Sequence, residues 1–151
     1  MRIEEAITEK LQLYANYNCT FQFFTAMTNE EAIQICNKIR QIAYNLHVYL
    51  GAGFLEKVYE NGLAHRLKNA GMNVQTQVPV HVFDEDGFII GEYVIDLLVD
   101  GILIELKTVS TLLPIHTAQV VNYLKATRRE HALLINYGAY KFQCKKIVIQ
   151  N

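Results

Sequence analysis

The sequence predicts a mixed α/β domain, in which helices pack on one mixed sheet in an α+β arrangement. Apolar residues follow a helical spacing before residue 71 and again after residue 111, whereas the period changes to two between residues 74 and 109. The chain has 151 residues, of which 51% are hydrophobic and 19% are charged. This is enough for one domain with a sizeable core, in the expected order α-α-β-β-β-α-β-β.

Two helices are expected at the start of this domain. The first begins after Thr28, because Glu31 three residues later completes a capping box. Its apolar residues keep a helical spacing until Gly51-Ala52-Gly53, which ends it. A second helix is expected over residues 54–70, with Gly71 as its stop.

Three strands are expected next, joined by tight turns. The first ends near residue 83, before the acidic turn 84–87, and the second covers residues 88–99. Asp100-Gly101 between two aliphatic runs is a strong hairpin signal and places the third strand at residues 102–109. The remaining expected elements are a helix over 112–126 with Pro114 in its first turn, a strand over 132–136, a turn at Tyr137-Gly138 and a strand over 142–149.

Composition excludes several classes of protein. A formal net charge of −1 argues against a protein that coats nucleic acid by bulk electrostatics. No apolar run approaches the roughly 18–20 residues of a membrane span, and the charged start is not a secretory signal. Cys19, Cys36 and Cys144 form neither a disulfide framework nor a zinc spacing, so a cytoplasmic location is expected.

The hairpin around Asp100-Gly101 carries charged residues that need compensation. Its register places Asp96 opposite Glu105, and Lys107 lies on the same face. The other face is wholly aliphatic and is expected in the core: Ile95, Leu97, Val99, Ile102, Ile104 and Leu106. Opposed carboxylates repel each other, so either Lys107 neutralises the pair or a hard divalent cation binds it. Spacing alone leaves both explanations open.

Polar residues on the flanking helices extend this set. Gln119 and Tyr123 are neighbours at i,i+4, with His116 on the same strip, which is equally a solvated helix face. Glu56 lies in the first turn of its helix, where the macrodipole favours a negative charge without any catalytic role. Glu60 follows one turn later. No glycine-rich phosphate loop and no Ser-His-Asp order is legible.

Several motifs recur in an order that resembles one known family. The stretch Gly53-Phe54-Leu55-Glu56-Lys57-Val58-Tyr59 matches the signature of the GxxExxY proteins of bacteria and archaea. The resemblance covers about residues 28–150 and continues through Val94-Ile95-Asp96, Ile104-Glu105-Leu106-Lys107, the His116…Gln119…Tyr123 helix and the strand end at 134–138. That family is assigned to the PD-(D/E)XK nuclease superfamily, whose core is restriction-endonuclease-like. Ala52 stands where proline is common, and Ile95 replaces the proline before the aspartate.

The resemblance implies a metal-dependent nuclease that hydrolyses phosphodiester bonds in nucleic acid, with DNA ahead of RNA. Six site residues follow from the matched motifs: Asp96, Glu105, Lys107, Gln119, Tyr123 and Glu56. Asp96, Glu105 and Glu56 would hold Mg²⁺, with Mn²⁺ as the alternative ion. Lys107 would orient water or stabilise the transition state, and the helical Gln-x-x-x-Tyr pair would position the substrate.

A nuclease fold that binds a partner without cleaving it is the alternative function. The near-zero net charge and the absence of a separate DNA-reading domain favour that alternative. The resemblance assigns residues 27–151 to the nuclease-like domain and leaves residues 1–26 as an N-terminal extension. Since the matching families begin near the Thr28 helix, Met27 is an expected translation start.

Overall fold

The structure is a computed structural model that describes residue 8 and residues 27–150. Its elements are α2 (Asn29–Leu50), α3 (Glu56–Asn69), β1 (Val74–Phe83), β2 (Ile89–Val99), β3 (Ile102–Lys107), α4 (Pro114–Thr127), β4 (His131–Asn136) and β5 (Gln143–Val148). The predicted order of helices and strands is confirmed. The predicted extension over residues 1–26 lies outside the described residues, apart from residue 8.

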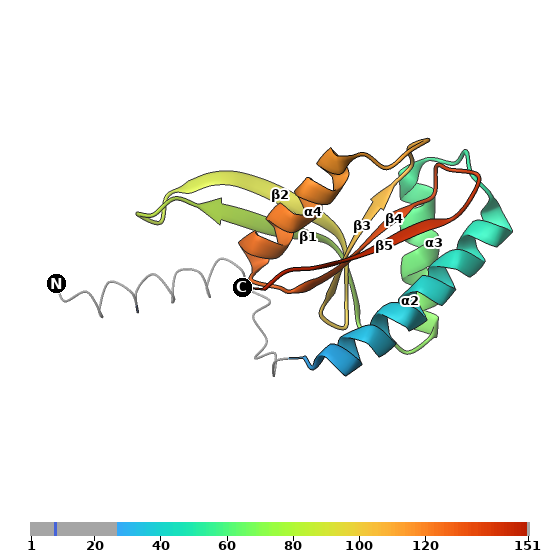
Figure 1. Cartoon of the computed structure of the whole chain (residues 1–151), viewed down its shortest axis with the longest axis horizontal. Helices are drawn as coiled ribbons and strands as arrows, with labels where there is room; N and C mark the ends of the chain where they lie inside the picture. The colour runs from blue at the N-terminus through green and yellow to red at the C-terminus, as the bar shows by residue number, and fades with distance from the viewer. Residues whose placement is uncertain (1–7, 9–26, 151) are drawn as a thin grey trace.

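One five-stranded sheet in the order β1-β2-β3-β4-β5 organises the described part of the chain. All neighbouring strands are antiparallel except β3 and β4, which run parallel and are connected through α4. Figure 1 shows α4 on one face of the sheet, with α2 and α3 on the other. The residues of β4 are all buried, as are those of β3 up to Leu106.

Helix α2 begins and ends where local sequence chemistry places its caps, whereas α3 begins later than predicted. The Thr28 hydroxyl accepts a hydrogen bond of 3.2 Å from the Glu31 N–H, and Glu31 Oε2 accepts one of 2.8 Å from the Thr28 N–H. Gly51 ends α2 with φ of +70°. Helix α3 begins at Glu56 rather than at residue 54, because the backbone is still extended at its N-cap, Leu55, after a positive φ of 111° at Gly53.

The hairpin between β2 and β3 follows the predicted turn. Asp100 and Gly101 have φ of 45° and 88°, the two positive values of a type I′ turn. The observed pairs are Val99 with Ile102, Leu98 with Leu103, and Leu97 with Ile104. The expected further pair of Asp96 with Glu105 is not part of this ladder, which is the first correction to the predicted register.

The two faces of the β1–β2 ribbon exchange sides along its length: the face that packs under α2 and α3 near the hairpin turn packs under α4 further on. Leu97 and Val74 belong to the core under α2 and α3, whereas Ile95 and Val78 belong to the core under α4. In a regular strand Ile95 and Leu97 would share a face, so the prediction that they do is wrong. The ribbon turns over between these residues, at Gln77, whose φ is 51°.

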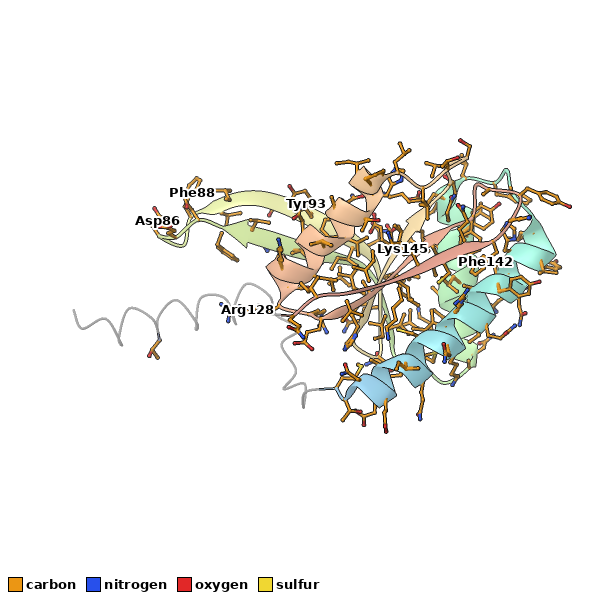
Figure 2. The ribbon with its side chains drawn as sticks, in the orientation of Figure 1. Asp86, Phe88, Tyr93, Arg128, Phe142 and Lys145 are labelled. Carbon is orange, nitrogen blue, oxygen red and sulfur yellow. The ribbon has the colours of Figure 1, made fainter. Side chains whose placement is uncertain are left out.

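Beyond this point the ribbon projects from the body of the molecule as an arm (Figure 1). Asp86 and Phe88 lie at its far end, and Tyr93 lies closer to α4 (Figure 2). The Tyr93 ring centroid is 5.5 Å from that of Tyr123 on α4, so the base of the arm packs on that helix.

The structure also bears on the membrane and cysteine predictions made from the sequence. In the described range, no helix is both long and apolar enough to cross a membrane. Cys36 is buried in the core under α2 and α3, Cys144 packs against it, and both are free thiols. Cys19 lies outside the described residues.

Candidate functional site

Asp96 lies where β2 separates from β3. Its Oδ2 accepts a hydrogen bond of 2.8 Å from the Leu106 N–H. The carboxylate therefore takes the place of the backbone acceptor that β2 no longer supplies beyond the pair of Leu97 with Ile104. Asp96 was predicted to stand directly across from Glu105 in a regular ladder, whereas its side chain caps the backbone one residue further along β3.

Glu105 lies on the α4 side of β3 and is only 4% exposed. Its Oε1 accepts a hydrogen bond of 3.1 Å from Lys107 Nζ, as expected for residues two apart on one strand face. Its Oε2 is buried and has no hydrogen-bond partner among the described residues. An unpartnered carboxylate oxygen in a protein interior is costly, so its presence points to a ligand that would satisfy it.

The electrostatics of this pair favour the same conclusion. Burial, together with the negative charge of Asp96 and against the opposing effect of Lys107, raises the pKa of Glu105 to about 7. Burial also raises the pKa of Asp96, although the Leu106 N–H stabilises its charged form. Both carboxyls thus hold protons more tightly than usual, chiefly because burial penalises their charged forms, although the side-chain interaction with Glu105 lowers the pKa of Asp96.

Glu56 contributes a third carboxyl from the first turn of α3. Burial raises its pKa, the charge of Asp96 raises it further, and Lys107 lowers it. Glu56 therefore belongs to the same electrostatic group as the two strand residues, although no hydrogen bond joins it to them within the described range. Glu56 is the first residue of α3, and its predicted role as a metal ligand stays a prediction.

Helix α4 covers the site with the predicted pair. Gln119 Nε2 donates a hydrogen bond of 2.7 Å to the Tyr123 hydroxyl. Burial raises the pKa of Tyr123, and the charges of Glu105, Lys107 and Asp96 also act on it. His116, expected on the same strip, instead accepts a hydrogen bond of 2.9 Å from the Leu113 N–H through Nδ1 and so caps the start of α4.

Glu60 is a buried carboxyl beside the site, where its charge raises the pKa of Asp96, and it was not among the predicted site residues. It is 4% exposed, and its Oε1 forms an ion pair of 2.7 Å with Lys57 Nζ. Its Oε2 accepts a hydrogen bond of 2.9 Å from Gln77 Nε2. The only signal in the sequence was its place one helical turn after Glu56.

The described residues show how far the site is prepared for a metal ion. No three His, Cys, Asp or Glu side chains between residues 27 and 150 come together as a metal-binding group. Asp96, Glu105 and Glu56 therefore do not form a preformed three-ligand cage. Mg²⁺ needs less, because it is usually held by one or two carboxylates together with water and substrate phosphate. The unpartnered Glu105 Oε2 beside Asp96 fits that requirement.

Asn136 fixes the backbone just beyond Lys107. It is fully buried at the end of β4, in register with Lys107. Its Oδ1 accepts hydrogen bonds from the N–H groups of Val109 (3.0 Å) and Gly138 (2.9 Å). Its Nδ2 donates to Val109 O and to Gln143 Oε1, both at 2.8 Å. The sequence predicted only a strand end and a turn here, and this clamp was missed.

Tyr59, the last residue of the signature, shapes the loop that leads to Glu56. Its hydroxyl donates a hydrogen bond of 2.6 Å to Gly51 O and accepts one of 3.3 Å from the Phe54 N–H. Its ring stacks on Tyr137 with centroids 4.5 Å apart and planes 9° apart. The signature tyrosine is thus a structural residue that ties α3 to the end of β4.

Replacing Tyr59 with phenylalanine is expected to lower the free energy of unfolding by roughly 1–2 kcal/mol, because Gly51 O and the Phe54 N–H both lose their partner while the stacked ring remains. Urea denaturation followed by circular dichroism measures this change. Tyr140→Phe is the matched control, because Tyr140 is 94% exposed and its hydroxyl should contribute nothing. Equal stabilities of the two variants would contradict the assigned hydrogen bonds.

Comparisons with known proteins agree with this architecture. A solved structure titled "Crystal structure of SSO0001" is similar to the chain with a TM-score of 0.53 and 18% identity, over 96% of this chain and 79% of that one, a likeness of fold alone. No curated protein matches the chain. The family model described as the PD-(D/E)XK nuclease superfamily matches residues 33–147, a range that contains every predicted site residue. The five-stranded mixed sheet and its flanking helices are consistent with a restriction-endonuclease-like core, and the chain belongs to the PD-(D/E)XK nuclease superfamily.

Proposed function

We propose that the chain is a metal-dependent nuclease that hydrolyses phosphodiester bonds in nucleic acid, with Mg²⁺ as its ion and Mn²⁺ as a substitute. One observation carries the proposal. Glu105 Oε2 is buried without a hydrogen-bond partner in the described structure, next to the Asp96 carboxylate and the Lys107 ammonium. Two carboxylates and one lysine in this arrangement suit a hard divalent cation and a phosphate group. Membership of the GxxExxY family is part of the same proposal.

Each side chain has a distinct role in this proposal. Asp96 and Glu105 would hold the ion, with Glu56 at the edge of the same group. A bound divalent ion would lower the pKa of a water molecule and stabilise negative charge on the phosphate. Lys107, held by Glu105, would donate its remaining N–H groups to a phosphate oxygen.

Gln119 and Tyr123 on α4 would contact the substrate from the helix that packs over the strand residues of the site. Because Gln119 donates to the Tyr123 hydroxyl oxygen, the hydroxyl proton of Tyr123 is left to donate to a substrate oxygen. Lys145 on β5 reaches the same helix, where its Nζ donates a hydrogen bond of 3.2 Å to Thr117 Oγ1. These donors suit a polyanion at the local site even though the net charge of the chain is −1. We favour DNA over RNA as the polyanion and the cytoplasm as the location.

A nuclease assay tests the proposal directly. Purified protein is incubated with end-labelled single-stranded DNA, duplex DNA and RNA, each with Mg²⁺, Mn²⁺ or a chelator. Cleavage should require a divalent ion and should fall by about a hundredfold or more in Asp96→Ala and in Lys107→Met. Glu85→Gln is the control for removing a charge, since Glu85 is exposed at the tip of the arm and far along the chain from the site.

Two outcomes would overturn the assignment. Normal cleavage by Asp96→Ala would show that another group performs the reaction. A folded wild-type protein that shows no Mn²⁺ binding in calorimetry, yet retains nucleic acid on a filter, would support the alternative of a binding module without catalysis. That alternative is compatible with the absence of a three-ligand cage in residues 27–150.

A further inference from the structure

The ribbon formed by β1 and β2 turns over at one residue, and that residue stands across from Asp96. Thr76 pairs with Leu97 and Val78 pairs with Ile95, so Gln77 occupies the position between these pairs, opposite Asp96. Gln77 has φ of 51°, in the left-handed region that residues with a Cβ avoid. Glycine and asparagine are the usual residues in this conformation, but residue 77 is a glutamine.

A buried carboxylate on α3 accounts for the unusual backbone. Gln77 Nε2 donates a hydrogen bond of 2.9 Å to Glu60 Oε2, and the Glu60 side chain is only 5% exposed. The other oxygen of Glu60 is paired with Lys57. Glu60 is therefore anchored on its helix, and a buried carboxylate keeps its hydrogen-bond donors because losing one would leave charge uncompensated. The left-handed backbone of Gln77 thus coincides with a hydrogen bond from its side chain to α3.

The reversal of the ribbon's faces at Gln77 coincides with the hydrogen bond that holds the carboxylate of Asp96, the proposed metal ligand. Where the ribbon turns, β2 leaves β3, and the ladder stops at Leu97 and Ile104. The Leu106 N–H then lacks a backbone acceptor on that side and binds Asp96 Oδ2 instead. If the ribbon continued without turning, β2 would pair with β3 beyond Ile104, and the carboxylate of Asp96 would not be needed at this N–H.

We propose that Gln77, held in its left-handed conformation by Glu60, is a positioning residue that places the carboxylate of Asp96 at the Leu106 N–H. Neither Gln77 nor Glu60 touches the substrate or the metal in this scheme. The meaning of the inference for catalysis rests on the proposed function. The hydrogen bond from Leu106 to Asp96 can nevertheless be measured without metal or substrate.

The test compares three substitutions at one position in the full chain. Gln77→Val disfavours a positive φ because valine is β-branched, whereas Gln77→Gly adopts it freely; both remove the side-chain amide. Amide hydrogen exchange of Leu106, followed by NMR in metal-free protein, reports the hydrogen bond to Asp96. Asp96→Ala gives the exchange rate of the broken bond, and the Ile104 amide serves as the internal control for the neighbouring ladder.

We expect the Leu106 amide to exchange about tenfold faster or more in Gln77→Val, approaching the rate of Asp96→Ala, with the Ile104 amide unchanged. In Gln77→Gly the rate should stay much closer to that of the wild type, because the left-handed backbone is retained. Wild-type exchange of Leu106 in a folded Gln77→Val protein would overturn the proposal. Equal loss of protection in the valine and glycine variants would overturn the role of the backbone conformation.

A third variant keeps the test decisive if Gln77→Val does not fold. Gln77→Ala also lacks the amide but is not β-branched, so Leu106 should exchange faster in Gln77→Ala than in Gln77→Gly; equal rates would contradict the proposal. Calorimetry with Mn²⁺ then separates a failure of the proposed function from a failure of the positioning role of Gln77. A wild-type protein that neither binds Mn²⁺ nor cleaves nucleic acid would overturn the proposed function, whereas the exchange comparison would still decide the role of Gln77.

Discussion

Replacing Glu105 with glutamine is expected to stabilise the metal-free protein at alkaline pH and to remove its response to divalent ions. Burial and the charge of Asp96 raise the pKa of Glu105 from an ordinary value of 4.5 to about 7. The folded protein therefore holds a proton between these two pH values that the unfolded chain has already released. Stability must fall as the pH rises through this window, and above pH 7 the full penalty of the buried charge is present.

Glutamine has nearly the same shape and carries no charge, so it escapes that penalty. The advantage of Glu105→Gln over the wild type should grow by on the order of 2 kcal/mol between pH 5 and pH 8. Urea denaturation at both pH values measures it. Glu85→Gln, at an exposed position, should show no such growth. A variant whose stability followed the pH dependence of the wild type would contradict the raised pKa.

The same variant separates stability from function. Mn²⁺ should raise the melting temperature of the wild type at pH 8, because an ion that binds only the folded state stabilises it. It should do so less at pH 6, where the proton of Glu105 competes with the ion. Glu105→Gln should not respond at either pH. A stabilising substitution that abolishes activity is the expected sign of a site whose charges are kept for function.

Replacing Gly138 with alanine is expected to be among the most destabilising single substitutions in the described part of the chain. An added Cβ would lie 2.6 Å from Val109 O and would also overlap the Thr108 carbonyl carbon and the Val109 nitrogen. These are backbone atoms held by the Asn136 amide, so they cannot move aside as a side chain would. The free energy of unfolding should fall by roughly 3 kcal/mol, and nuclease activity should fall with it because Lys107 directly precedes the displaced segment.

Gly91→Ala is the matched control for this prediction. The added Cβ at Gly91 would meet only Tyr93 Cε2 at 3.8 Å, an ordinary contact, and Gly91 has no positive φ. Its stability should stay within about 0.5 kcal/mol of the wild type. Thermal and urea denaturation of both variants decide the matter, and a Gly138→Ala protein as stable as Gly91→Ala would refute the close backbone approach.

The elements that the sequence predicted correctly are those determined by local chemistry. The capping box at Thr28 and the Asp100-Gly101 turn depend on residues within three or four positions of one another, so the sequence shows them directly. The placement of Lys107 beside Glu105 follows from strand alternation alone. Within the proposed site, local chemistry therefore predicts the adjacent positions of Glu105 and Lys107.

The features that the sequence did not predict depend on contacts between distant residues. Gln77 has no intrinsic tendency towards a positive φ, and its partner Glu60 is 17 residues away. The amide of Asn136 binds Val109 across 27 residues. The separation of β2 from β3 at Asp96 follows from the first of these contacts in our proposal. A periodicity that assumes regular strands therefore places Ile95 on the wrong face.

The two halves of the proposed site also differ in how soon they can assemble during folding. Asp96 and Leu106 are ten residues apart on one β-hairpin, and such a hairpin forms in roughly 1–10 μs. The clamp of Asn136 on the segment after Lys107 requires α4 to cross over and β4 to pair in parallel, a non-local and slower event. A chain emerging from the ribosome would thus bring Asp96, Glu105 and Lys107 together on one hairpin before the segment after Lys107 is fixed, and hydrolytic competence would arrive only with the last strands.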